Sequence, residues 1–151
     1  CNNSDFMKNY QHVLLTADFS EEGDLVAHRA RQIANLYRAK LSIIHVLDNI
    51  PMPDTGYGTL IPLDQTTDYE LLEAEKLKLI RLAERLHVDP ADRWLIWGGP
   101  REEIVRLAEG QAADLIVIGS HGRRGLAMLL GSTANGVLHG THAYVLAVRL
   151  P

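Results

Sequence analysis

The stretch from residue 114 to residue 140 places the tightest constraint on how this chain can fold. It opens with Leu115-Ile-Val-Ile118, a continuous apolar run of the kind that is buried on both faces of a parallel sheet. Gly119 ends the run, and after a loop with further glycines a short helix is expected to begin at Gly131 and reach residue 138. A buried strand, a glycine loop and a helix in this order favour an α/β fold.

The same stretch has the composition of an anion site. Glycines let the backbone approach an oxyanion closely, and the free N–H groups at a helix start point toward it. Ser132 can add a hydroxyl group. Scattered glycines also serve ordinary turns that need a positive φ, so two interpretations stay open here, a phosphate loop and a plain connection.

The rest of the chain repeats the alternation of strand and helix. We expect strands over residues 12–17, 41–47, 94–97, 115–118 and 143–149, and helices over residues 21–39, 67–86, 100–108 and 131–138. Ser20 is the expected cap of the first helix, because its hydroxyl can accept a free backbone N–H. Five strands and four helices in this order predict a single doubly wound, Rossmann-like α/β domain. Its mainly parallel sheet would carry helices on both faces.

Two segments between these elements carry separate expectations. Residues 48–65 hold several prolines and glycines and show no periodicity, so we expect a long loop there. The helix after it has a polar face, which we interpret as solvated surface: Glu70, Glu73, Lys76 and Arg81.

Composition excludes several classes of function. The formal net charge of −4 argues against non-specific binding to nucleic acid or to anionic membranes. No apolar run approaches the roughly 20 residues that span a bilayer, so a cytoplasmic location is the default expectation. Cys1 is the only cysteine, which rules out a disulfide within the chain. We expect residues 1–6 to be a disordered or extraneous extension and residues 7–151 to form the domain.

Motifs that would carry catalysis or metal binding are missing. The Walker A pattern, the Gly-x-Gly-x-x-Gly fingerprint and the Gly-x-Ser-x-Gly elbow do not occur. His139-x2-His142 alone is too weak a signal for a metal site. His45 ends a buried strand and is interpreted as a core histidine whose ring nitrogens have partners. The sequence therefore predicts no catalytic residue and no metal ligand set.

The ordered set Gly119-x2-Gly122 followed by Gly131-Ser132 resembles the universal stress protein family, whose ATP-binding members carry Gly-x2-Gly-x9-Gly-Ser/Thr. The resemblance covers nearly all of residues 7–149 and extends to residues 13–20 and 42–46, to Gly98-x-Pro100 and to the last strand. Residues 123–130 are one residue short of the family spacing. Two functions stay open. One is a stress-response regulatory protein that binds ATP, with Mg²⁺, and is at most a slow ATPase. The other is a dimer without nucleotide that acts through protein partners.

The resemblance also implies a set of binding residues at the carboxyl ends of the strands. It places Asp18 near ribose and adenine, the backbone of Val46 at the adenine ring, and the glycine loop at the phosphates. The implied set is Ala17, Asp18, Val46, Gly119, His121, Gly122, Arg123, Gly131, Ser132 and Thr133. From the residues alone, Asp18 could instead be a helix-capping acid and Val46 a core residue.

The last strand carries an expectation about assembly. Residues Tyr144–Val148 should lie at a sheet edge, where unpaired N–H and C=O groups invite another strand, and only Arg149 and Pro151 could blunt that edge. The resemblance implies a homodimer in which this strand pairs antiparallel with its copy.

Overall fold

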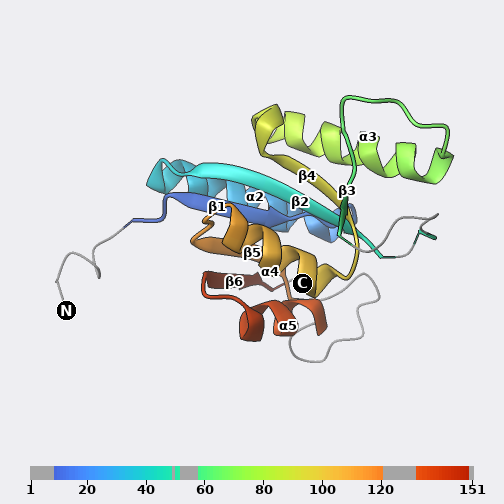
Figure 1. The fold of residues 1–151 in the computed structure, drawn as a ribbon. Coiled ribbons are helices and arrows are strands. Elements are labelled where there is room, and N and C mark those ends of the chain that lie inside the picture. The colour runs from blue at the N-terminus through green and yellow to red at the C-terminus, as the bar shows by residue number, and fades with distance from the viewer. Residues whose placement is uncertain (1–8, 49, 52–57, 121–131, 150–151) are drawn as a thin grey trace.

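The computed structural model describes residues 9–48, 50–51, 58–120 and 132–149, with the side chain of Ser132 left aside. The elements alternate along the chain as expected (Figure 1). In chain order they are β1 (His12–Thr16), α2 (Glu21–Tyr37), β2 (Lys40–Leu47), β3 (Thr59–Leu60), α3 (Glu70–Arg85), the 3₁₀ turn η1 (Pro90–Asp92), β4 (Arg93–Trp97), α4 (Pro100–Gly110), β5 (Leu115–Gly119), α5 (Ser132–Gly140) and β6 (Tyr144–Val148).

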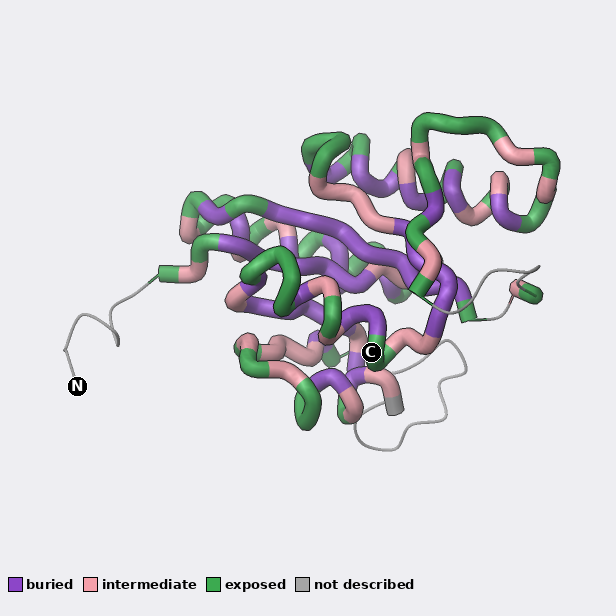
Figure 2. The backbone as a smooth tube through the Cα atoms, in the orientation of Figure 1, coloured by how far each residue is buried: buried purple, intermediate pink, exposed green. Residues whose placement is uncertain are grey.

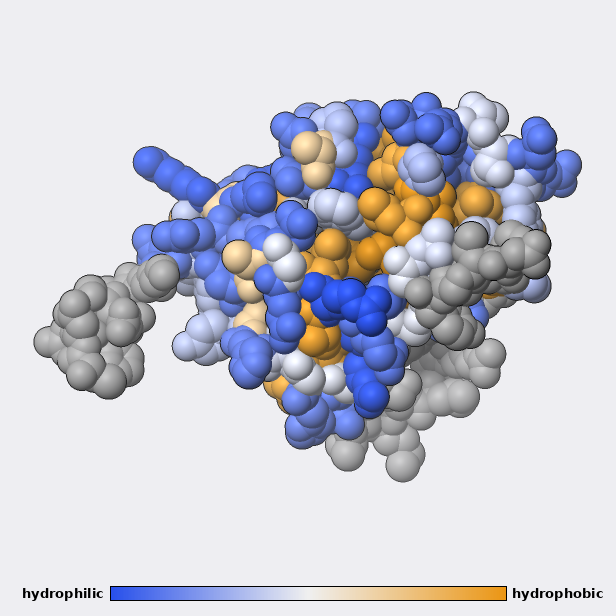
Figure 3. All heavy atoms as spheres, viewed as in Figure 1, coloured by the Kyte–Doolittle hydropathy of each residue, from blue (hydrophilic) through white to orange (hydrophobic). Residues whose placement is uncertain are grey.

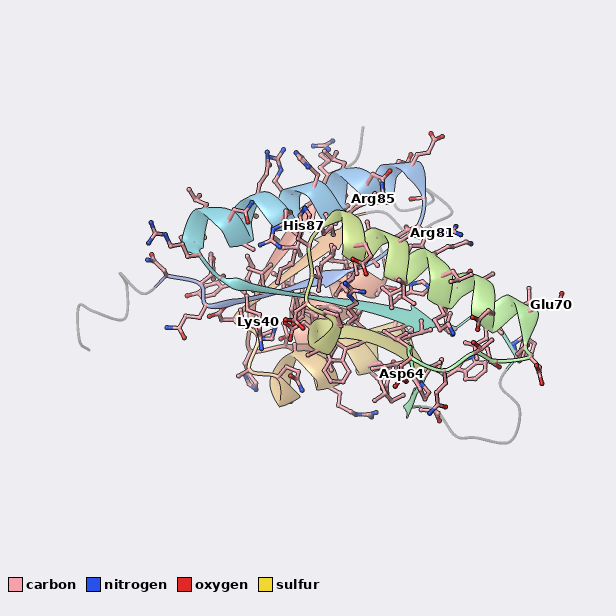
Figure 4. All side chains as sticks on the ribbon, turned by 90° about the horizontal axis from the view of Figure 1, so that it is seen from above. Lys40, Asp64, Glu70, Arg81, Arg85 and His87 are labelled. Atoms are coloured by element: carbon pink, nitrogen blue, oxygen red, sulfur yellow. The ribbon has the colours of Figure 1, made fainter. Side chains whose placement is uncertain are left out.

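The strands form one sheet in the order β3-β4-β2-β1-β5-β6. All neighbouring pairs are parallel except β3 with β4. Helices α2 and α3 pack on one face of the sheet and α4 and α5 on the other (Figures 1 and 4). The predicted doubly wound α/β fold is thereby confirmed.

The core follows from the alternation of side chains along each strand. In β1, Val13 and Leu15 pack toward α2 and α3, whereas Leu14 packs on the side of α4 and α5. Figure 2 shows the central strands as almost entirely buried, with the exposed residues on the helices and the connecting loops. Both faces of the sheet are covered at its centre, which explains why these strands read as continuous apolar runs.

The prediction of five strands was wrong by one, because the segment 48–65 contains the short antiparallel strand β3. Gly58, at a φ of 89°, donates its N–H to the carbonyl oxygen of Trp97 at 2.7 Å. The N–H of Ile61 reaches the carbonyl oxygen of Leu95 at 2.9 Å. A strand of two residues is too short to show any periodicity, so the sequence pattern could not reveal it.

The prediction of a solvated polar face on α3 was wrong for Lys76. Its side chain is buried, and Nζ donates to the carbonyl oxygen of Gln65 at 2.6 Å and lies 2.8 Å from Oε1 of Glu73. The other oxygen of Glu73 accepts the N–H of Thr67 at 3.2 Å. These contacts tie the segment before α3 to the helix, which begins at Glu70 rather than at Thr67. Glu70 and Arg81, labelled in Figure 4, are exposed as expected.

One side of the sheet keeps apolar side chains at the surface. Figure 3 shows them over β3 and β4 and beside α4. Leu60 pairs with Ile96 across these two strands and remains 52% exposed. Trp94, on the same side of β4 as Ile96, is partly buried. Among the described helices, none is long and apolar enough to cross a membrane.

Candidate functional site

The strand order reverses between β1 and β5, the point at which ligands bind in open α/β sheets. Ala17 and Asp18 follow the end of β1, and Gly119 ends β5, the parallel neighbour of β1. Val46 is the residue before the last one of β2. Strand β2 is the other neighbour of β1, on the side away from β5. The structure thus places four of the predicted residues at the carboxyl ends of three adjacent strands.

The turn after β1 is held by a chain of hydrogen bonds. Ala17 donates its N–H to the carbonyl oxygen of Ile44 at 2.8 Å, so the turn begins against β2. Oδ1 of Asp18 accepts the N–H of Ser20 at 3.0 Å, and Oγ of Ser20 accepts the N–H of Gly23 at 3.1 Å. The prediction that Ser20 caps α2 is confirmed. Asp18 is not the cap of α2, and its carboxylate instead stabilises the turn by accepting the N–H of Ser20.

The backbone of α2 approaches this turn closely at Gly23. A Cβ atom at this position would lie 1.7 Å from the carbonyl oxygen of Asp18. The first turn of α2 therefore packs directly against the backbone of Asp18. Only glycine, which has no side chain, allows this close approach at position 23.

His45 lies beneath the same turn. Its ring is buried, with Nδ1 3.0 Å from the carbonyl oxygen of Ala17 and Nε2 3.2 Å from Oε2 of Glu75 on α3. The ring of Phe19 lies 4.4 Å away between centroids. The imidazole holds the pKa of the Glu75 carboxyl at about 2, although burial works in the opposite direction. His45 is a buried core histidine as interpreted, and its Nδ1 has a hydrogen-bond partner, but Nε2 has none among the described residues and only lies close to Glu75. The sequence did not indicate Glu75, because it lies on a distant helix.

The end of β5 contributes a polar group that the sequence did not single out as a binding residue. Ser120 follows Gly119, is buried, and donates its N–H to the carbonyl oxygen of Val148 at 2.9 Å. Its Oγ has no hydrogen-bond partner among the described residues. Buried hydroxyls normally have partners, so this atom can accommodate a polar ligand atom or a neighbouring group.

Several predicted residues lie outside the described part of the chain. These are His121, Gly122, Arg123 and Gly131, so the glycine loop itself stays a prediction. Ser132 and Thr133 are placed as the first two residues of α5, and Thr133 is half-buried. Within residues 9–48, 50–51, 58–120 and 132–149, no group of three His, Cys, Asp or Glu side chains could hold a metal ion.

The fold and this arrangement define a doubly wound α/β protein with a candidate site where the strand order reverses. Residues 9–149 match the universal stress protein family. Universal stress protein A homolog 2 of Coxiella burnetii is 32% identical over 146 residues, which cover 95% of this chain and 98% of that protein. The chain therefore belongs to the universal stress protein family.

Solved structures of the family agree with the fold. A universal stress protein in complex with cAMP has a TM-score of 0.66 and 22% identity, and the match covers 95% of this chain and 100% of that one. The universal stress protein from Archaeoglobus fulgidus in complex with dAMP has a TM-score of 0.60 and 21% identity, with the same coverage of both chains.

Proposed function

We propose that this protein is a stress-response regulatory protein that binds ATP, with Mg²⁺, at the carboxyl ends of β1, β2 and β5. The observation that supports the proposal best is that Ala17, Asp18, Val46 and Gly119 lie at the carboxyl ends of the adjacent strands β1, β2 and β5, beside the point where the strand order reverses. Two structural neighbours are complexes with cAMP and dAMP, which favours an adenine nucleotide as the ligand.

The described residues fit such a ligand at both of its ends. Asp18 offers a carboxylate for ribose hydroxyls, and the backbone beside Val46 offers hydrogen bonds to the adenine edge. At the phosphate end, the N–H groups of the first turn of α5 favour anions, and Oγ of Ser120, beside Gly119, has no hydrogen-bond partner within the part of the chain that the structure describes. Bound Mg²⁺ would neutralise phosphate charge, and such an ion usually takes many of its ligands from phosphates and water.

Replacing Asp18 by Ala tests the adenosine end of the proposed site. We expect a weaker affinity for MgATP in calorimetric titration and a loss of about 1 kcal/mol of stability from the broken bond to Ser20. Asp24→Ala is the matched control, because it removes an exposed carboxylate from the first turn of α2. An Asp18→Ala variant that loses stability but binds MgATP as the parent does would assign Asp18 to the turn alone.

A second function is favoured by one feature of the sequence, the loop of residues 123–130 that is one residue short of the family spacing. In this alternative the protein is a dimer without nucleotide that acts through protein partners. Absence of any binding heat with MgATP in the parent protein would favour this alternative over the first.

We further propose that the protein forms a homodimer through β6. This strand lies at the edge of the sheet beside β5, and its first residue, Tyr144, is 71% exposed.

Sedimentation at micromolar concentration should give the mass of a dimer. Leu146→Lys should shift the mass to that of a monomer, because in the proposed antiparallel pair, centred on Leu146, this residue would meet its own copy and like charges would repel there. Leu71→Lys, at an exposed position on α3, should leave the dimer intact. A monomeric parent would contradict the proposal.

A further inference from the structure

Arg101, in the first turn of α4, was not predicted as a binding residue, yet its side chain lies across α5. A Cβ atom at Gly136 of α5 would lie 2.7 Å from Cγ of Arg101 and closer still to Cδ. The aliphatic part of the arginine therefore packs directly on the backbone of α5, in space that only a glycine at position 136 leaves free.

The guanidinium group of Arg101 lies toward the start of α4. Its Nη2 is 3.4 Å from Oε1 of Glu102, and a Cβ atom at Gly99, the cap residue of α4, would collide with the other oxygen of that carboxylate. The two side chains are 61% and 56% exposed, so solvent screens the pair and it contributes little stability. Arg101 can therefore exchange this partner for a ligand anion at little cost.

Arg101 and the start of α5 lie at the same end of the sheet. Helix α4 follows β4 and α5 follows β5, and both helices begin at the carboxyl ends of the parallel strands (Figure 1). Gly136 lies one helical turn after Ser132, on the same face of α5 and about 6 Å farther along its axis. The arginine thus crosses α5 one turn from the N–H groups that the proposed function assigns to phosphate.

A buried polar group gives a second sign of a ligand at this end of the sheet. Ser120 is 7% exposed, and its Oγ has no hydrogen-bond partner in the described ranges 9–48, 50–51, 58–120 and 132–149. Ile116 and Ile118 of β5 pack on the side of α4 and α5. The N–H of Ser120 still pairs with the carbonyl oxygen of Val148, so the alternation along the strand places Ser120 on that side too.

We propose that Arg101 binds the phosphates farthest from the ribose and makes the site prefer ATP to AMP. The inference rests on the proposed function and adds to it a specificity residue. The adenosine end of the site lies at Asp18 and Val46, at the ends of β1 and β2, so a chain of phosphates that reaches α5 runs toward Arg101, whereas AMP ends before it. A guanidinium group suits this role, because it stays charged and offers several N–H donors to phosphate oxygens.

Calorimetric titration of the purified protein with MgATP and with AMP tests the claim. Arg101→Ala should weaken MgATP binding by about tenfold, the lower end for a hydrogen bond to a charged group, and should change AMP binding by less than about twofold. Arg85→Ala is the matched control, because it removes an arginine of similar exposure, 63%, with an exposed acidic partner, from the last turn of α3. This control should bind both nucleotides as the parent does.

Gly136→Ala separates the position of the arginine from its charge. The added Cβ atom fills the space of the Arg101 side chain and turns it away, so MgATP binding should fall by a similar factor although the arginine is present. Gly140→Ala is the control on the same helix, because a Cβ atom there would only come into ordinary contact with Val105, at 3.4 Å. When Arg101→Ala and Gly136→Ala are combined, the loss should not exceed that of either alone, since both act through one contact.

Equal weakening of MgATP and AMP binding in Arg101→Ala would overturn the inference, because an effect through the fold alone does not distinguish the two nucleotides. MgATP binding that is unchanged in Arg101→Ala would overturn it as well, while binding by the parent would still support the proposed function. A parent protein that binds neither nucleotide would contradict the proposed function itself, and the inference with it.

Discussion

Gly23→Ala should destabilise the protein by about 3 kcal/mol, at the upper end of the usual cost of overpacking. Alanine is normally the better helix former by about 1 kcal/mol, so the helix propensity alone would predict a gain. The contact outweighs it, because the added Cβ would lie 1.7 Å from the carbonyl oxygen of Asp18, and that atom belongs to backbone that cannot rotate away. Urea or thermal unfolding of the purified variant measures the loss.

Gly110→Ala is the matched control for this change. A Cβ atom at Gly110, at the end of α4, would meet nothing within 4 Å. The substitution should therefore leave stability unchanged or raise it by up to about 1 kcal/mol. Equal effects at the two glycines would contradict the close approach of α2 to the Asp18 turn.

Acidification should remove about 3 kcal/mol of stability that depends on Glu75. The ion pair with His45 lowers the pKa of this carboxyl from 4.5 to about 2, and a shift of one pKa unit corresponds to about 1.4 kcal/mol. A lowered pKa means that the stabilisation is fully present above about pH 4.5 and is lost as the pH falls toward 2.

Urea unfolding at a series of pH values between about 5 and about 2 measures this effect as a difference between parent and Glu75→Gln. The advantage of the parent should shrink as the pH falls. Glu84→Gln is the control, because the side chain of Glu84 on the same helix is 66% exposed and its pair with Arg93 is screened by solvent. A difference between parent and Glu75→Gln that stays constant over this range would show that the carboxylate is not held by His45.

The sequence predicted the fold well because the fold rests on local patterns. Buried runs such as Leu115-Ile-Val-Ile118 and the cap at Ser20 depend on neighbours in the chain, and the structure confirms both. The edge position of β6 was also predicted correctly, since it follows from the order of the elements.

The errors arose where contacts join distant segments. The sequence pattern of its helix places Lys76 at the surface. The side chain is buried, and its Nζ donates to the carbonyl oxygen of Gln65, in the segment before the helix. Glu75 looks equally ordinary, and its role depends on His45, which lies in another element. No periodicity in α3 could have revealed either contact, because both partners come from outside the helix.

The candidate site could be predicted in part for the same reason. The ends of the strands follow from the strand pattern, so the positions of Ala17 and Gly119 could be anticipated. The bond between Ala17 and His45 could not, because it depends on how the turn packs against β2.

Melting the protein with and without MgATP tests whether a nucleotide binds where the strand order reverses. At a hundredfold excess over its dissociation constant the ligand should add about 2.7 kcal/mol, which corresponds to a rise in Tm of roughly 5–10 °C for a chain of this size. Ser132→Asp should abolish the rise, because it places a carboxylate at the first residue of α5, where phosphate is proposed to sit. The helix itself should tolerate Asp in its first turn. Asn135→Asp, exposed on the same helix, should keep the rise. A parent protein whose Tm does not change with MgATP would show that this site does not bind the nucleotide and would favour the dimer without nucleotide.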